Sequence, residues 1–209
     1  MTVTFPPSKL SELLTELNEK SVSFRIRFAT PTDTDNANNR GFEVSIRQHS
    51  SNQLYYFRNM AVGENQNNKG YTFVIYSKEN NSIVGFFSFR YAHIKMGKKF
   101  ESKKPVALEL TYYLLNKEFK NSTQGKTLEK ELRVKVGEIV METFIKPLAH
   151  ALASYANVSR CYMLSPRKLK LLLYMKKKWK LKASPAGYLF AKFTGEKERR
   201  FRKLLYWNV

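Results

Sequence analysis

Hydrophobic residues recur along this chain with two periods, one typical of helices and the other typical of strands. In residues 8–20, leucines repeat every three or four positions, and this spacing predicts an amphipathic helix. In residues 22–28, apolar and polar side chains alternate, which predicts a strand with one solvated face. Residues 30–41 and 63–70 are polar and predict loops, whereas residues 42–47 have the pattern of a short strand.

The clearest pair of strands lies in the middle of the chain. Residues 71–77 and 82–90 are largely apolar, and the four residues between them, KENN, suit a hairpin turn. A further strand is predicted at residues 106–115, where Glu109 is the only charged residue in the run VALELTYYLL. Antiparallel pairing is expected for the first two strands, because a short turn joins them.

A long helix is predicted after these strands. Apolar residues from Leu128 to Leu148 recur at spacings of three and four, so the helix should begin near Lys126, and Pro147 could kink it. The next elements are a strand, a helix, a strand and a basic helix: residues 158–164, 166–178, 188–193 and 196–205. This order predicts an α/β (α+β) fold with a mixed central sheet flanked by helices and a basic C-terminal helix.

Length and composition restrict the class of protein. The chain has 209 residues, which suits one domain, and 43% apolar with 14% aromatic residues excludes intrinsic disorder of the whole chain. The single cysteine, Cys161, cannot form an internal disulfide. No apolar run reaches the roughly 20 residues of a membrane span, and the N-terminus has no signal-peptide pattern. A cytoplasmic protein is therefore expected.

The net charge changes the picture most. It is +20 at pH 7, and residues 151–209 carry +13 of it. Such an excess suggests an anionic partner: nucleic acid, an acidic membrane surface or a polyphosphate cofactor. The alternative is a compositional bias toward lysine that has no functional meaning.

One segment between a predicted strand and a predicted helix could bind phosphate. A loop that leads into a helix N-terminus offers free backbone N–H groups and the positive end of the helix dipole. The segment contains two lysines, one glycine and no carboxylate: Lys120, Asn121, Ser122, Thr123, Gln124, Gly125 and Lys126. The alternative is a polar connection without a ligand.

The run from residue 71 to residue 193 resembles the GNAT superfamily of acyl-CoA-dependent N-acyltransferases. The hairpin YTFVIYSKENNSIVGFFSF is similar to the family's second and third strands. The segment LELTYYLLNKEFKNSTQGKTLEKEL resembles the fourth strand, the pyrophosphate loop and the following helix. The stretches VSRCYMLSP and KLKLLLYMKKKWKLK resemble the fifth strand and the helix after it. The resemblance implies a core over residues 71–195, an acceptor-side part over 1–70 and a basic tail over 196–209.

The resemblance also implies a coenzyme A site, and acetyl-CoA is the expected donor. The family motif Q/R-x-x-G-x-G/A places Lys120 at its first position, Thr123 at the first glycine and Gly125 at the last. Leu114 and Leu115, at the end of the fourth strand, would hold the thioester. Thr123 departs from the motif, because a β-branched residue resists the conformations that glycine permits. A second register would place Glu129 opposite the phosphates and is disfavoured.

Two residues match catalytic positions of the family. Glu109 lies on the fourth strand, where the family often has its base, and Tyr174 lies where the family has its general acid. The alternatives are that Glu109 pairs with a cation on a sheet face and that Tyr174 only packs. No metal site is expected, because His49, His93 and His150 lack the spacing of ligands.

The basic residues near the C-terminus suggest a nucleic-acid partner. Lysines and arginines interleaved with aromatic residues suit RNA, through phosphate pairing and stacking. The candidates are Lys168, Lys170, Lys176, Lys177, Lys178, Lys180, Arg199, Arg200 and Arg202. Some GNAT enzymes acetylate aminoacyl-tRNA, so the resemblance implies an amine acceptor on RNA or on protein. The other hypothesis is a non-catalytic module that binds nucleic acid and whose coenzyme A loop has degenerated.

Overall fold

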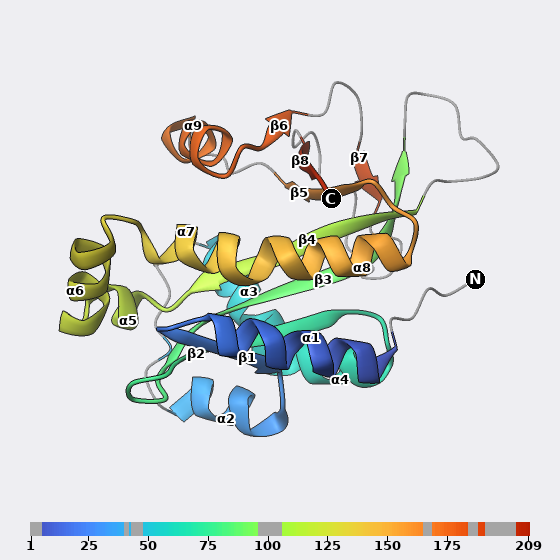
Figure 1. The fold of residues 1–209 in the computed structure, drawn as a ribbon. Coiled ribbons are helices and arrows are strands. Elements are labelled where there is room, and N and C mark those ends of the chain that lie inside the picture. Colours follow the sequence, from blue (N-terminus) through green and yellow to red (C-terminus); the bar gives the residue numbers. More distant parts are fainter. Residues whose placement is uncertain are drawn as a thin grey trace.

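The computed structural model describes residues 6–39, 42, 48–95, 106–164, 169–183, 188–190 and 204–209. In this described part, eight strands form one sheet in the order β1-β2-β3-β4-β5-β8-β6, and β7 pairs with β3 (Figure 1). The strands are β1 Phe24–Phe28, β2 Tyr71–Ser77, β3 Ile83–Lys95, β4 Val106–Leu115, β5 Arg160–Leu164, β6 Lys182–Ala183, β7 Tyr188–Phe190 and β8 Leu204–Asn208. Only the pair β4–β5 is parallel among them. The predicted mixed sheet is confirmed.

Three strands predicted in the first half of the chain are confirmed as β1, β2 and β3, although β3 extends five residues beyond its predicted end at residue 90. The hairpin pairs β2 with β3, and Asn81 in its turn has a positive φ of 57°, which asparagine tolerates better than most residues. β4 has the predicted bounds. β1 begins two residues later than the alternation predicts, and Val22, which precedes it, is 91% exposed.

Two segments predicted to be loops are partly helical. Residues 30–41 contain α2 (Pro31–Asn39), and the first half of 63–70 belongs to α4 (Ala61–Gln66). A third helix, α3 (Gln48–Asn59), was not predicted. None of these helices has the regular apolar stripe on which the sequence prediction relied.

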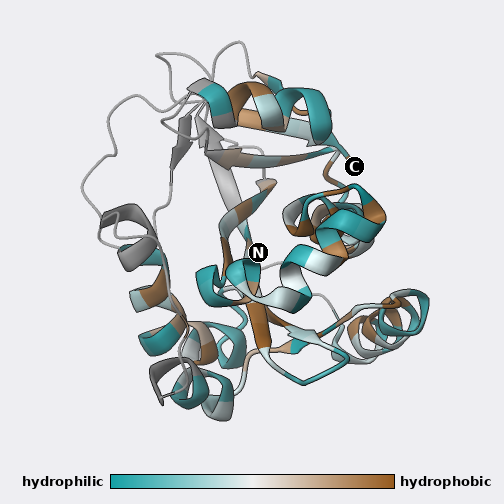
Figure 2. Cartoon of the chain, turned by 90° about the vertical axis from the view of Figure 1, so that its left-hand side faces the viewer, coloured by the Kyte–Doolittle hydropathy of each residue, from teal (hydrophilic) through white to brown (hydrophobic). Residues whose placement is uncertain are grey.

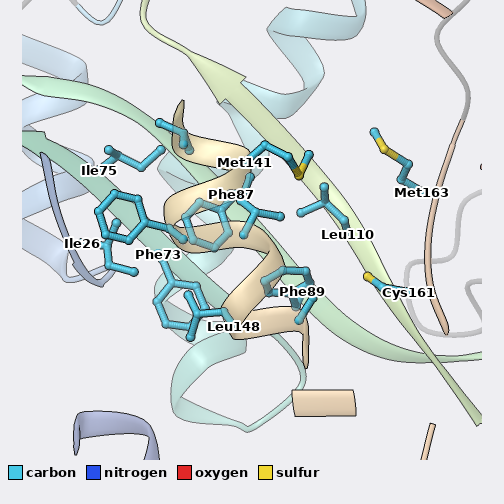
Figure 3. Close-up of a cluster of buried hydrophobic side chains, with 14 of the residues drawn as sticks. Ile26, Phe73, Ile75, Phe87, Phe89, Leu110, Met141, Leu148, Cys161 and Met163 are labelled. Atoms are coloured by element: carbon cyan, nitrogen blue, oxygen red, sulfur yellow. The ribbon is translucent and has the colours of Figure 1, made fainter. Parts of the chain in front are cut away.

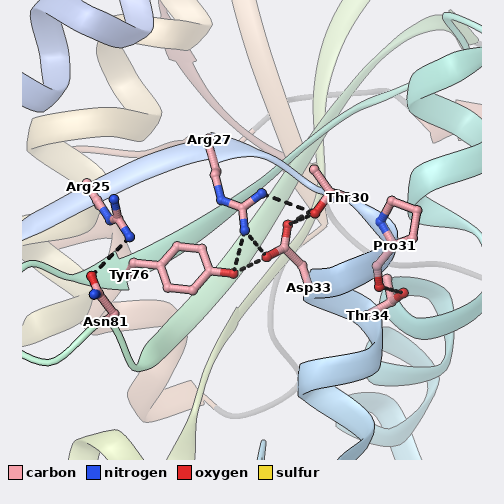
Figure 4. A network of polar contacts seen from close by, with 8 residues as sticks. All are labelled: Arg25, Arg27, Thr30, Pro31, Asp33, Thr34, Tyr76 and Asn81. Atoms are coloured by element: carbon pink, nitrogen blue, oxygen red, sulfur yellow. Dashed lines mark hydrogen bonds and ion pairs between the residues drawn. The ribbon is translucent and has the colours of Figure 1, made fainter.

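A polar network explains why α2 forms. The buried carboxylate of Asp33 accepts hydrogen bonds from the backbone N–H and the hydroxyl of Thr30, both at 2.8 Å, and so satisfies the start of the helix. Arg27 donates to the same carboxylate at 2.6 Å, and the Tyr76 hydroxyl also donates to it (Figure 4). Side chains from β1 and β2 therefore fix the first turn of α2.

The crossover from β4 to β5 differs from the prediction. The helix expected to begin near Lys126 is preceded by two short helices, α5 (Lys117–Asn121) and α6 (Thr123–Leu132). Asn116 and Ser122 cap them with side-chain oxygens that accept from the backbone N–H groups of Glu118 and Gly125. The long helix then runs without a break through α7 (Val136–Val140), the π-helical turn η1 (Met141–Ile145) and α8 (Lys146–Tyr155).

The helix is interrupted before its predicted kink rather than at it. Arg133, which follows α6, has a left-handed backbone with a φ of 52°, and this residue separates α6 from the long helix. Pro147 lies in the first turn of α8, directly after the π-helical turn. Proline has no N–H to donate, and a π-helical turn is one way in which a continuous helix accommodates it.

The C-terminal predictions hold only in part. β5 and α9 (Leu169–Lys178) confirm the strand and helix predicted there. The strand predicted at 188–193 is described for 188–190 only, and the strand at 42–47 is described only at Phe42, which lies outside any strand. Of the predicted basic helix, only residues 204–205 are described; they belong to β8, so the helix prediction is wrong there. Leu205 and Trp207 are buried on one face of β8, and this period of two is typical of a strand.

Helices cover both faces of the sheet. α1 (Pro7–Lys20) and the long helix lie on one face, and α3 and α4 lie on the other (Figure 1). The larger core lies under α1 and the long helix, where Phe73, Phe87 and Phe89 pack against Leu148 (Figure 3). The strands at the centre are the most hydrophobic part of the molecule, and polar residues lie on the outer sides of the helices (Figure 2). No helix among the described residues is long and apolar enough to cross a membrane.

Candidate functional site

The carboxyl-terminal half of β4 departs from regular pairing. On β3, Ser88 and Phe89 are consecutive, but their partners on β4 are Tyr112 and Leu110, so Thr111 is an extra residue that forms a bulge. On the other side, the described pairing with β5 covers only Leu108 and Glu109 of β4. A bulge bends a strand and frees backbone groups from the ladder. The end of β4 is thus open toward the β5 side.

The start of the long helix lies directly against this end of β4. The Tyr113 hydroxyl donates a hydrogen bond of 2.9 Å to the backbone carbonyl of Gly137. A Cβ at Gly137 would lie 3.3 Å from the Tyr113 hydroxyl and 3.5 Å from a methyl group of Leu115. Burial raises the pKa of Tyr113 above its usual value, so the hydroxyl stays protonated and keeps this bond.

α9 forms the third side of the site. The Tyr174 hydroxyl donates to Glu138 Oε2 at 3.1 Å, and Trp179 packs its ring 5.8 Å from that of Tyr113. Burial and then the charge of Glu138 raise the pKa of Tyr174 to about 12. Trp179 is 5% exposed, and its buried Nε1 has no hydrogen-bond partner among the described residues. Tyr174, the predicted general acid, therefore lies beside the start of the long helix.

The segment predicted as a pyrophosphate loop is helical. Lys120 lies in the last turn of α5, and Gly125 lies in the first turn of α6, where an added Cβ would be 2.3 Å from the carbonyl oxygen of Phe119. Glycine is needed there for a close approach of backbone to backbone rather than for contact with a ligand. Asn121, Thr123 and Lys126 have exposed side chains.

Gln124 anchors this helical insertion to the hairpin. Its amide Nε2 donates to Ser77 Oγ at 2.8 Å, and its Oε1 accepts from Asn80 Nδ2 at 3.1 Å. The insertion therefore packs on the β2–β3 turn. Of the two predicted leucines, Leu115 lies near Gly137 at the start of the long helix, whereas Leu114 packs on the other face of the sheet.

Charged groups meet at the N-terminus of the long helix. Glu129 Oε1 accepts from the backbone N–H of Val136 at 3.0 Å, and its Oε2 accepts from Lys135 Nζ at 2.9 Å. Burial opposes the charge of Glu129, but these two bonds and the charges of Lys135 and Lys120 lower its pKa overall. Lys120 thus acts through its charge on the carboxylate that binds the start of the long helix, and this helix begins at Val136 rather than near the predicted Lys126.

Glu109 is engaged by a cation on the sheet. It is 2% exposed, and its Oε2 accepts from Arg90 Nε at 2.6 Å, across the β3–β4 pair. Of the two interpretations of Glu109 from the sequence, this is the ion pair on a sheet face. The register places Tyr162 of β5 directly beside Glu109.

The described part of the basic region lies on α9 and directly after it. Five of the predicted lysines are described here and have exposed side chains: Lys170, Lys176, Lys177, Lys178 and Lys180. Lys178 Nζ is 4.0 Å from Glu138 Oε1, so the basic helix face borders the site around Tyr174. The other predicted cations, Lys168, Arg199, Arg200 and Arg202, lie outside the described residues.

Sequence reasoning missed several residues of the site. Tyr113, Lys135, Glu138 and the position of Gly137 were not singled out. The available signal was the run RVKVGEIV at residues 133–140, in which a basic residue and a glycine precede a helical apolar pattern.

The described chain, with its bulged β4 paired in parallel with β5, matches solved structures of low sequence identity over most of its length, and the resemblance seen in the sequence is confirmed at the level of the fold. A crystal structure of a mutant of KacT matches with a TM-score of 0.53 and 8% identity, over 90% of this chain and 95% of that one. A bacterial toxin matches with a TM-score of 0.51 and 6% identity, over 88% and 90%. A mutant of the toxin AtaT, bound to the C-terminus of the antitoxin AtaR, matches with a TM-score of 0.50 and 11% identity, over 88% and 91%. No family model matches the sequence, and no curated protein is significantly similar to it.

Proposed function

We propose that this protein is an acetyl-CoA-dependent N-acetyltransferase that transfers the acetyl group to an amine. The observation that carries the proposal is the juxtaposition of a bulged, half-open β4 with the start of a long helix and with Tyr174. In this arrangement, backbone groups, a helix N-terminus and a phenolic proton donor face one region. These are the groups that acyl transfer from a phosphorylated thioester carrier requires.

The residues at the site fit coenzyme A. Lys120, Lys135 and the N-terminus of the long helix would hold its diphosphate, because all three attract anions. Residues 111–115 would line the path of its pantetheine arm, and Thr111 Oγ1 is buried without a hydrogen-bond partner among the residues described. The other predicted contacts, at residues 121–126, would then lie at the edge of the diphosphate. Acetyl-CoA supplies the thioester, and the protein supplies position and charge.

Tyr174 and Glu109 have separate roles in this proposal. Tyr174 keeps its proton at neutral pH, since its pKa is about 12, and can donate it to the departing sulfur after it leaves Glu138. Glu109 would bind the ammonium group of the acceptor only by exchanging its contact with Arg90. We assign Glu109 to orienting the amine. It would act as the predicted base only after its carboxylate had released Arg90.

The acceptor that we favour is the amino group of an aminoacyl-tRNA. The exposed lysines on α9 lie on the same helix as Tyr174, so phosphates bound along α9 would bring a charged RNA end to the site. The net charge of +20 supports a polyanionic acceptor more than a small amine or a neutral peptide.

A second candidate is a nucleic-acid-binding module without catalysis. It is favoured by the state of the predicted phosphate site: Thr123 replaces a glycine, and a carboxylate from the chain itself binds the helix N-terminus. In that case the basic face would bind RNA, and the cofactor site would be closed.

Calorimetric titration of acetyl-CoA distinguishes the two candidates. We expect binding that weakens about tenfold in Lys135→Ala and Lys120→Ala, since each removes one charge contact to the diphosphate. Lys9→Ala is the control, because this lysine is exposed on α1 and is not among the residues assigned to the diphosphate. Acetylation of a set of aminoacyl-tRNAs by wild type, and its loss in Tyr174→Phe, would complete the assignment. Salt-sensitive RNA binding without any acetyl-CoA binding would establish the second candidate instead.

A further inference from the structure

The long helix carries a negative charge of the protein's own at its N-terminus. Glu129 accepts a 3.0 Å hydrogen bond from the Val136 N–H in the first turn and a 2.9 Å bond from Lys135 Nζ. Lys120 adds a third favourable interaction through its charge. A backbone donor and a lysine, which together would suit a phosphate, are therefore already bound by a carboxylate of the chain itself.

This carboxylate comes from a separate element. Glu129 lies on α6, whereas Val136 begins the helix that runs from α7 through η1 to α8 over residues 136–155. The left-handed residue Arg133 lies between the two helices, and Leu132 at the end of α6 is 49% exposed. The contact therefore joins two helices across a short connection, and Glu129 can leave the helix N-terminus without any change inside the long helix.

A second observation at the same place points to a missing acceptor. Trp179 is only 5% exposed, and its buried indole Nε1 has no hydrogen-bond partner in the described part of the chain. The ring atom Cζ2, on the same edge of the indole as Nε1, is 4.0 Å from the Cβ position of Gly137 in the first turn of the long helix. A buried donor without a partner costs free energy, so a ligand that supplies an acceptor here would be favoured.

We propose that Glu129 is a built-in competitor for the anionic group that binds at the N-terminus of the long helix. In the resting protein its carboxylate occupies the position of a phosphate, and a diphosphate must displace it from Val136 and Lys135. The identity of the natural ligand as acetyl-CoA rests on the proposed function, but the competition itself concerns any diphosphate. The device lowers the affinity for diphosphates and makes occupancy of the site depend on the position of α6.

The test compares two charge-neutralising variants on the same helix. Glu129→Gln removes the competing charge but keeps an amide oxygen that can accept from Val136. Glu131→Gln removes an equal charge from an exposed position on α6 and serves as the control for general electrostatics. Calorimetry measures the affinity of wild type and both variants for inorganic pyrophosphate and for coenzyme A, at one fixed salt concentration. Thermal unfolding of each free protein checks that it is folded.

We expect Glu129→Gln to bind both probes about tenfold more tightly than wild type, because a charged competitor has been replaced by a neutral one. Glu131→Gln should change either affinity by less than about twofold. Equal affinities of wild type and Glu129→Gln for both probes, or no binding of pyrophosphate by any form, would overturn the inference. A gain for pyrophosphate in Glu129→Gln, with coenzyme A bound no better than pyrophosphate, would support the competitor and contradict the proposed function. Tight binding of coenzyme A that is the same in all three proteins would support the function and contradict the competitor.

Discussion

Gly85 on β3 approaches the backbone of β4 at the point where the candidate site begins. A Cβ at this position would lie 2.4 Å from the carbonyl oxygen of Leu114 and 3.1 Å from the Cα of Leu115. Ordinary contact begins at 3.4 Å, so Gly85→Ala would force β4 to move by about 1 Å relative to β3. Because the obstructing atoms belong to the backbone of a paired strand, no side-chain rotation can relieve the contact.

The expected cost follows from this geometry. Overpacking in a closed core costs about 1–3 kcal/mol, and the lower chain entropy of alanine returns about 0.5–1 kcal/mol, so a net loss of about 1 kcal/mol is expected. For a chain of this length, that loss corresponds to a fall in melting temperature of about 2–4 °C. Acetyl-CoA affinity should fall as well, because Leu114 and Leu115 line the proposed path of the pantetheine arm.

Urea unfolding, followed by circular dichroism, measures the change in the free energy of unfolding. Gly63→Ala is the matched control: this glycine is exposed on α4, no described atom lies within 4 Å of its Cβ position, and alanine is the better helix former. We expect the control to be as stable as wild type or slightly more stable. A midpoint for Gly85→Ala equal to that of wild type, with an unchanged slope, would show that β3 and β4 are not held this closely.

Three further predictions concern other contacts of the structure. Asn18 closes the free edge of β1: its Oδ1 accepts from the Ile26 N–H at 2.7 Å, and its Nδ2 donates to the Ile26 carbonyl at 2.8 Å. Asn18→Ala should therefore lower the free energy of unfolding, measured by urea titration, by about 2 kcal/mol, and Asn18→Asp should lower it by less. Glu138→Gln should lower the pKa of Tyr174 from about 12 toward 10. The titration is measured as tyrosinate absorbance, and this signal should be absent in Tyr174→Phe. In the wild type, the raised pKa of Tyr174 in the folded state makes the free energy of unfolding fall as pH rises from about 10 to about 12. Arg90→Met should destabilise the protein strongly, by about 3 kcal/mol, because it leaves the buried carboxylate of Glu109 unpaired, and Arg90→Met combined with Glu109→Gln should recover part of that loss in thermal unfolding.

The sequence was most informative where packing follows a simple period. The strands β2 and β4 were predicted with the bounds that the structure has, because their apolar runs are buried on both faces or alternate regularly, whereas β3 extends five residues further than predicted. The sequence failed at α2, where helix formation depends on Asp33, whose partners Arg27 and Tyr76 come from other strands. It also failed at residues 204–205, since a strand between β5 and β6 is stabilised by long-range pairing that no local pattern shows.

The site was harder to predict than the fold because its parts are separated along the chain by an insertion. The family motif would directly follow β4, but there the chain has α5 and α6 instead of a loop. Two competing registers at residues 120–129 follow from this insertion, since neither contains the start of the long helix. The register that would place Glu129 opposite the phosphates was disfavoured because of its charge, yet the structure brings that carboxylate to the helix N-terminus beside Lys135. A charge that excludes a residue as a ligand for phosphate is the property that allows it to take the place of one.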